Sequence, residues 1–79
     1  GYFVEPTLFA DVNENARIAQ EEIFGPVLAV IRAKDFEDAM RIANASPFGL
    51  SASVQTTNVS RVFDFVYGME AGLLTVNLP

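Results

Sequence analysis

The residues whose types and spacing suggest chemistry lie in Gln20–Pro26, which reads Gln-Glu-Glu-Ile-Phe-Gly-Pro. Two acids lead directly into an Ile-Phe-Gly-Pro turn, and a run of apolar residues follows. A carboxylate at the approach to a parallel strand can accept hydrogen bonds from two hydroxyl groups of a sugar, as acidic residues do with ribose. The adjacent aromatic ring of Phe24 can limit the position of a flat heterocycle. This interpretation makes the segment a candidate ligand site.

The same segment also has a purely structural interpretation. Glu21 and Glu22 can be the polar end of a short helix, and Phe24 can be a side chain that fills a core. Loop carboxylates without a function are commoner than functional ones, so residue type and spacing alone favour the structural interpretation. Both interpretations stay open at this point.

The rest of the chain contains no recognisable catalytic set. Histidine and cysteine are absent, so a thiolate nucleophile, a disulfide and an ordinary zinc site are excluded. The remaining candidates for acid–base work are carboxylates, hydroxyls, Lys34, Tyr2 and Tyr67, and no pair of them stands out by spacing. Acids at Asp35–Asp38 are typical of a helix start, where they favour the macrodipole. No glycine-rich phosphate loop or calcium loop is present, and we predict no catalytic residue and no metal site.

Composition limits the partners of this 79-residue chain. Five Lys and Arg against ten Asp and Glu give a net charge of −5, so nucleic acid and anionic membrane surfaces are poor partners. The longest apolar run, Val27–Ile31, is far shorter than the roughly 18 residues of a membrane span. No signal-peptide pattern is visible, and the cytoplasm is the default location. Because 51% of residues are hydrophobic and 19% charged, the chain is too apolar for a small free-standing domain.

Four strands are predicted along the chain. Val27–Ile31 is apolar at every position, which is typical of a parallel strand covered by helices on both faces. Phe3–Val12 alternates loosely and is interrupted by Pro6, so it predicts an edge strand. Leu50–Thr56 and Leu73–Val76 complete the set.

Three helices are predicted between these strands. Ala16–Glu22 is a short one. Asp35 is the expected N-cap of the second helix, which Ser46-Pro47 ends. Asn58 is the expected N-cap of the third, and Gly72 is expected to close it in a left-handed conformation. The amphipathic stripe of this last helix consists of Val59, Val62, Phe63, Val66 and Tyr67.

The order of these elements predicts an α/β fold, namely a partial parallel sheet with βαβαβ connections. No linker or composition shift divides the chain, so residues 1–79 are expected to form one partial domain. Strands that are apolar on both faces need helices above and below. The two helices within the βαβαβ order can hardly supply both layers. We therefore expect the chain to be part of a larger α/β domain, whose bare faces make the isolated piece prone to self-association.

Several ordered motifs resemble those of the aldehyde dehydrogenase superfamily. They cover essentially the whole chain, in the family's order and spacing. They are Gly1–Phe9 (GYFVEPTLF), Glu21–Val27 (EEIFGPV), Ile42–Asn44 (IAN), Phe48–Ala52 (FGLSA) and Ala71–Asn77 (AGLLTVN).

The resemblance implies an enzyme that oxidises an aldehyde to a carboxylic acid with NAD or NADP, of which this chain is part of the catalytic domain. By position, Glu22 is similar to the acid that hydrogen-bonds the nicotinamide ribose hydroxyls. Phe24 is similar to the aromatic that lies near the nicotinamide, and Gly25-Pro26 would shape that loop. Thr7 and Asn77 match recurrent family positions, to which we assign structure before chemistry.

The family's catalytic machinery has no counterpart here. Its cysteine nucleophile, general-base glutamate, oxyanion asparagine and glycine-rich cofactor fold belong to motifs upstream of Gly1, so the chain alone is expected to be inactive. Family members are commonly homo-oligomers, which we expect of the full-length protein. The alternative function is a small acidic interaction or scaffold module without a catalytic parent, supported only by the lack of a complete catalytic set.

Overall fold

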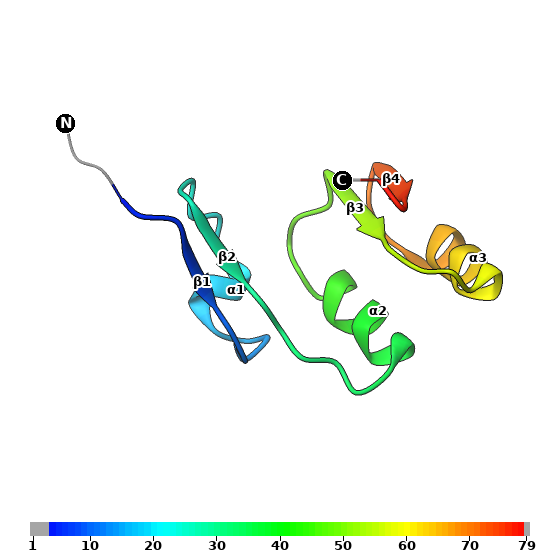
Figure 1. Cartoon of the computed structure of the whole chain (residues 1–79), viewed down its shortest axis with the longest axis horizontal. Helices are drawn as coiled ribbons and strands as arrows, with labels where there is room; N and C mark the ends of the chain where they lie inside the picture. Colours follow the sequence, from blue (N-terminus) through cyan, green and yellow to red (C-terminus); the bar gives the residue numbers. More distant parts are fainter. Residues whose placement is uncertain (1–3, 79) are drawn as a thin grey trace. The chain divides into compact units, whose positions relative to one another are not determined.

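The computed structural model describes residues 4–78, in which strands and helices alternate. The chain divides into two compact units, Gly1–Ala33 and Lys34–Pro79, which we call the N-terminal and C-terminal units (Figure 1). Each contains a pair of parallel strands and at least one helix, which confirms the predicted α/β class. That both units form one partial domain stays a prediction.

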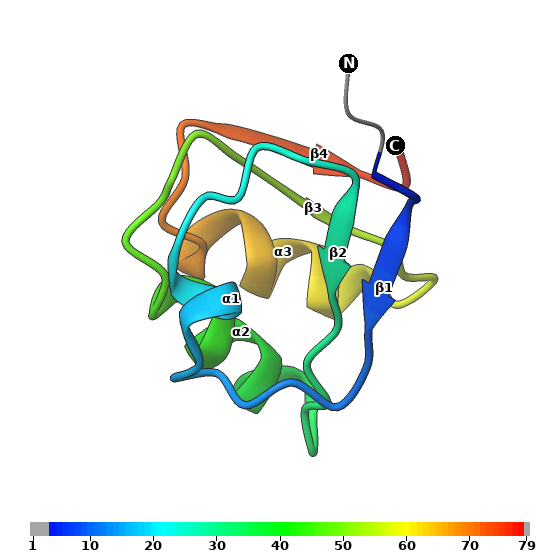
Figure 2. The same ribbon diagram turned by 90° about the vertical axis from the view of Figure 1, so that its left-hand side faces the viewer.

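The N-terminal unit consists of β1 (Thr7–Phe9), α1 (Arg17–Gln20) and β2 (Val27–Ala29). The two strands run parallel, with Thr7 opposite Val27, and Figure 2 shows them side by side. Since parallel neighbours need a crossover, the segment between them, α1 included, must return the chain to the start of β2. The loop at that point contains the candidate residues.

All three elements of this unit are shorter than the sequence predicts. The predicted edge strand Phe3–Val12 is reduced to β1, and Phe3 lies outside the described residues. The predicted helix Ala16–Glu22 is reduced to four residues. Its N-cap is an alanine that makes no side-chain hydrogen bond, so no side chain caps the first turn as a Ser, Asp or Asn would.

The two faces of β2 differ in burial. Val27 and Ala29 are half-buried, whereas 59% of Leu28 is exposed. The apolar run Val27–Ile31 predicts a strand that is buried on both faces. Residues 4–78 cover only one of these faces. Covering the other face requires protein outside this unit.

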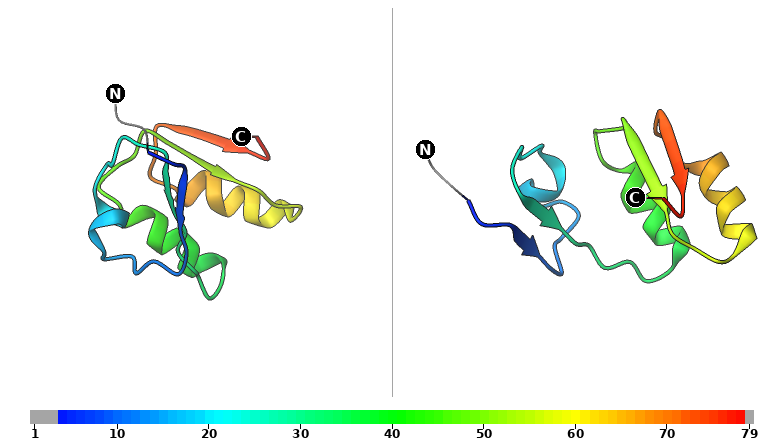
Figure 3. Two further views of the ribbon diagram at one scale, coloured as in Figure 1. Left: turned by 60° about the vertical axis from the view of Figure 1, so that its left-hand side comes forward. Right: turned by 45° about the horizontal axis from the view of Figure 1, so that its top comes forward.

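The C-terminal unit consists of α2 (Phe36–Asn44), β3 (Ser51–Val54), α3 (Val59–Gly68) and β4 (Leu73–Val76). β3 and β4 are parallel and joined through α3. Both helices lie on the same face of this strand pair (Figure 3). The half-buried residues of β3 are Ala52 and Val54, which alternate with exposed serines, so one face of the pair is covered and the other is open.

Two predicted N-caps are confirmed. The Asp35 carboxylate accepts a hydrogen bond from the Asp38 amide at 2.7 Å, and the Asn58 side chain accepts one from the Arg61 amide at 3.2 Å. Each satisfies an amide of the first turn that has no partner within the helix. α2 ends at Asn44, just before Ser46-Pro47, as predicted.

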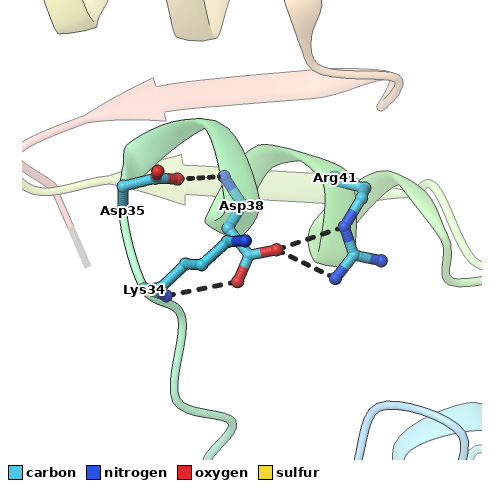
Figure 4. A network of polar contacts seen from close by, with 4 residues as sticks. All are labelled: Lys34, Asp35, Asp38 and Arg41. Carbon is cyan, nitrogen blue, oxygen red and sulfur yellow. Dashed lines mark hydrogen bonds and ion pairs between the residues drawn. The ribbon is translucent and has the colours of Figure 1, made fainter.

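The start of α2 holds a network of four residues (Figure 4). The Asp38 carboxylate accepts a hydrogen bond from the Lys34 amide at 3.2 Å and further ones from the Arg41 guanidinium at 3.1 and 2.9 Å. The Lys34 amide, followed by Arg41, lowers the pKa of Asp38 below its ordinary value of 3.8. All these bonds favour the charged carboxylate.

Acid should therefore weaken the start of α2. Because folding lowers the pKa of Asp38, its stabilising contribution is complete above 3.8 and is lost as the pH falls through the folded-state pKa. Circular dichroism between about pH 5 and about pH 2 measures this helix loss. At the upper pH the Asp38→Asn variant should have a lower helix content than the parent. In acid the helix contents of the two proteins should become equal. Glu37→Gln, an acid in the same turn, is the control and should follow the parent; an unchanged gap between Asp38→Asn and the parent would contradict the prediction.

The core of the C-terminal unit is centred on Phe65. Among residues 4–78 it is the only buried hydrophobic residue, with 3% of its surface exposed. Much of the predicted α3 stripe is exposed among residues 4–78: Val59, Phe63 and Tyr67 are 69%, 56% and 85% exposed. The helix is apolar on two sides, and the side of Phe65 and Met69 is the one that meets α2 and β3.

The prediction for Gly72 is wrong. α3 ends at Gly68, and none of the described glycines has a positive φ. A side chain does the capping instead: Asn44 donates to the Gly68 carbonyl at 2.8 Å and accepts from the Glu70 amide at 2.9 Å. Since this amide group satisfies the helix end, no left-handed glycine is needed. Gly72 starts the pairing with the segment before β3, through its amide and the Gly49 carbonyl at 2.8 Å.

Candidate functional site

The candidate loop begins where α1 ends. The Glu21 amide donates to the Arg17 carbonyl at 2.9 Å. The Glu21 carboxylate accepts from the Arg17 side chain through both oxygens, at 3.1 and 3.2 Å. This pair has the i,i+4 helical spacing and is exposed. The Glu21 carboxylate thus already has a partner, Arg17, within the N-terminal unit.

Glu22 differs from its neighbour. It is exposed and makes no hydrogen bond or ion pair with any residue from 4 to 78. An ionised carboxylate offers acceptor sites on two oxygens, and no residue from 4 to 78 uses those of Glu22. The structure therefore distinguishes the two acids, which residue type alone could not do.

Phe24 displays its ring instead of burying it. The residue is 88% exposed, so it does not fill the core of its own unit, and that structural interpretation is wrong within the described chain. Its φ is 55°, in the left-handed region that costs an L-residue roughly 1–2 kcal/mol. Such strained residues cluster at ligand sites.

The other side of the loop is tied to the sheet. The Val27 amide donates to the Gly25 carbonyl at 2.8 Å, which closes a tight turn at Pro26, and the Thr7 amide donates to the Pro26 carbonyl at 2.8 Å. The turn is thus built by Pro26 and by the pairing with β1. Gly25 has no positive φ, and a Cβ added to it would meet nothing within 4 Å.

A shallow hollow of about 420 Å³ lies on the β2 side of this loop. Neither Glu22 nor Phe24 lines it, so it is not a pocket built around the candidate residues. Its lining is Pro6, Thr7, Leu8, Gly25, Pro26, Val27 and Leu28.

Thr7 and Asn77 both have structural roles. Besides its backbone bond to Pro26, Thr7 donates its hydroxyl to the Glu5 carbonyl at 2.9 Å. Asn77 bonds Thr56 twice, accepting from its amide at 2.8 Å and donating to its carbonyl at 3.0 Å. These contacts support the assignment of structure before chemistry.

The described residues contain neither a cluster of metal ligands nor a helix that could span a membrane. Within 4–78 there is no group of three or more acidic residues close enough to hold a metal ion. Over the same range, no helix has the length and apolar character that crossing a membrane requires.

Comparison with known proteins gives the following matches. The model of the aldehyde dehydrogenase family matches residues 1–79. Over 77 residues the chain is 51% identical to alpha-ketoglutarate semialdehyde dehydrogenase from Haloferax volcanii, covering 98% of this chain and 16% of that protein.

Solved structures agree with this match. One is 1-pyrroline-5-carboxylate dehydrogenase from Thermus with bound NAD (TM-score 0.94, 47% identity, 98% of this chain and 15% of that one). Another is Mycobacterium tuberculosis aldehyde dehydrogenase complexed with NAD+ (TM-score 0.92, 47% identity, 100% and 16%). The chain spans about a sixth of the length of these relatives.

Proposed function

Because the chain belongs to the aldehyde dehydrogenase family, we propose that the whole protein oxidises an aldehyde to a carboxylic acid with NAD or NADP. In this proposal the chain is part of the catalytic domain, and Glu22 binds the hydroxyls of the nicotinamide ribose. One observation supports this role above others: among residues 4–78 Glu22 has no hydrogen-bond or ion-pair partner, whereas Glu21 is paired with Arg17. The matched structures with NAD support the cofactor class.

The chemistry of the two displayed side chains fits a nicotinamide riboside. Vicinal ribose hydroxyls are donors, and a carboxylate accepts them in charge-assisted hydrogen bonds that are stronger than neutral ones. The exposed ring of Phe24 offers an apolar surface beside a flat heterocycle. When bound, the cofactor accepts hydride from the substrate; the part of this chain is to bind and orient the cofactor.

The nucleophile must come from another part of the protein. The sequence contains no cysteine, and no residue of the loop can replace a thiolate. We propose that the chain by itself does not turn over aldehyde. A small acidic scaffold module, the alternative function, does not account for a family match that extends over residues 1–79.

We also propose that the whole protein is a homo-oligomer in the cytoplasm. The exposed apolar residues of both units, for example Leu28 and Tyr67, need cover from further protein or a second copy. The net charge of −5 disfavours nucleic acid as a partner.

The Glu22→Gln variant of the whole protein tests the cofactor role. Glutamine keeps the size of the side chain but loses the charge, so NADH or NADPH should bind about tenfold more weakly. Titration of the cofactor's fluorescence measures the affinity without any turnover. Glu21→Gln is the matched control, because it removes the adjacent charge; we expect it to bind nearly as well as the parent. Equal affinities for Glu22→Gln and the parent with both cofactors would refute the assignment.

A further inference from the structure

Phe24 stands apart from the other residues with left-handed backbone. Among residues 4–78, the non-glycine residues with positive φ are Asp11, Phe24 and Asn77. Asp and Asn adopt this region more readily than other residues, and both have side-chain partners, Arg32 for Asp11 and Thr56 for Asn77. Phe24 is bulky, and 88% of it is exposed. Contacts of its own ring therefore do not explain the strain.

The loop around Phe24 is held at both ends. On one side, the Glu21 amide is bonded to the Arg17 carbonyl at 2.9 Å. On the other, the Pro26 carbonyl accepts from the Thr7 amide at 2.8 Å. Residues 22–25 must connect these two anchors, and the left-handed residue lies within that connection. The backbone at position 24 is thus part of the short path that connects Glu22 to the start of β2.

Gly25 would be the easier place for a left-handed residue. Glycine adopts positive φ without a steric penalty, yet the φ of Gly25 is not positive. A Cβ at that position would also meet nothing within 4 Å, so packing does not demand glycine within this unit. The strain is located one residue earlier, on the residue nearer to Glu22.

We infer that the left-handed backbone of Phe24 is a positioning device for the Glu22 carboxylate, separate from any contact that the Phe24 ring makes. The inference rests on the proposed function, because it concerns the same cofactor site. A residue that disfavours positive φ should shift the loop towards conformations in which Glu22 is misplaced. Molecules with a misplaced Glu22 bind the cofactor without the contribution of that carboxylate, so the apparent affinity falls towards that of the Glu22→Gln variant as their fraction rises.

Two variants of the whole protein separate the effect of the Phe24 backbone conformation on cofactor affinity from the effect of its ring. Phe24→Asn and Phe24→Val both remove the ring, but Asn tolerates the left-handed region and β-branched Val does not. Any loss due to the ring is common to both. We expect Phe24→Val to bind NADH about tenfold more weakly than Phe24→Asn, as measured by fluorescence titration.

Adding Glu22→Gln to each variant shows whether the difference acts through Glu22. In the Asn background the charge should still matter, with a further loss of about tenfold; in the Val background the further loss should be small. Equal affinities of the Asn and Val variants would overturn the inference and, where Glu22→Gln still weakens binding, leave the proposed function intact. No effect of Glu22→Gln in the parent would refute both.

A second pair keeps the test decisive if Phe24→Val lowers the thermal stability of the protein. Phe24→Gly and Phe24→Ala differ by one methyl group, and only alanine is penalised at positive φ. Weaker binding by the alanine variant supports the inference, and equal binding overturns it.

Discussion

Replacing Phe65 by alanine should lower the free energy of unfolding of the C-terminal unit by about 3 kcal/mol. Phe65 is 3% exposed and lies where α3 meets α2 and β3, so truncation removes the centre of this small core. The estimate is at the low end of the range for buried phenylalanine. A hollow of about 170 Å³ already borders Phe65, Met40 and Val54, which gives the neighbouring side chains room to relax.

Phe63→Ala is the matched control on the same helix. Phe63 is 56% exposed and stacks on Tyr67, with ring centroids 6.5 Å apart. Its truncation should cost well under half as much as that of Phe65, because half of the ring already contacts solvent. Urea unfolding of the 79-residue chain, followed by circular dichroism, measures both. Equal losses for the two variants would show that the core lies elsewhere on α3.

The second large effect is expected from Asn77→Ala, at about 2 kcal/mol of unfolding free energy. The side chain makes two hydrogen bonds with Thr56, at 2.8 and 3.0 Å. The backbone amide adds a third, to the Val54 carbonyl at 2.8 Å. Asn77 thereby ties the end of β4 to the end of β3. Alanine loses both side-chain bonds and is strained at the φ of 55° that Asn77 adopts.

Asn77→Gly separates the two causes. Glycine also loses the side-chain bonds but is not strained at positive φ, so it should be about 1 kcal/mol more stable than the alanine variant. Urea unfolding of both variants against the parent gives the two differences. A glycine variant as unstable as the alanine variant would mean that strain does not contribute. An alanine variant as stable as the parent would refute the role of Asn77 in tying β4 to β3.

The features read correctly from the sequence depend on near neighbours. The Asp35 and Asn58 caps each involve an amide three residues away, so residue type and short spacing were enough to predict them. The strand β4 was predicted with its observed bounds, Leu73–Val76, because it is a short run of apolar and β-branched residues between Gly72 and Asn77. The family itself followed from ordered motifs along the chain.

The features that the sequence did not reveal depend on distant partners. Two sides of α3 are apolar, and only the packing of α2 and β3 shows that Phe65 faces inward. Gly72 was assigned to a helix end that Asn44 caps instead, from a position 24 residues before the Gly68 carbonyl that it binds. Helical periodicity and glycine statistics contain no information about such contacts.

For the candidate site, the sequence by itself determined the family, the α/β class and the segment Gln20–Pro26, because these depend on residue type and order. The folded structure decided which acid has no partner among residues 4–78, through a local helical contact, and how Phe24 is displayed, through the pairing of the strands. Arg17 occupies Glu21 through one helical turn, and the pairing of Thr7 with Pro26 anchors a loop in which Phe24 is left-handed. A backbone conformation that costs free energy persists only when surrounding contacts impose it, and the contact between Thr7 and Pro26 exists only after the strands have paired.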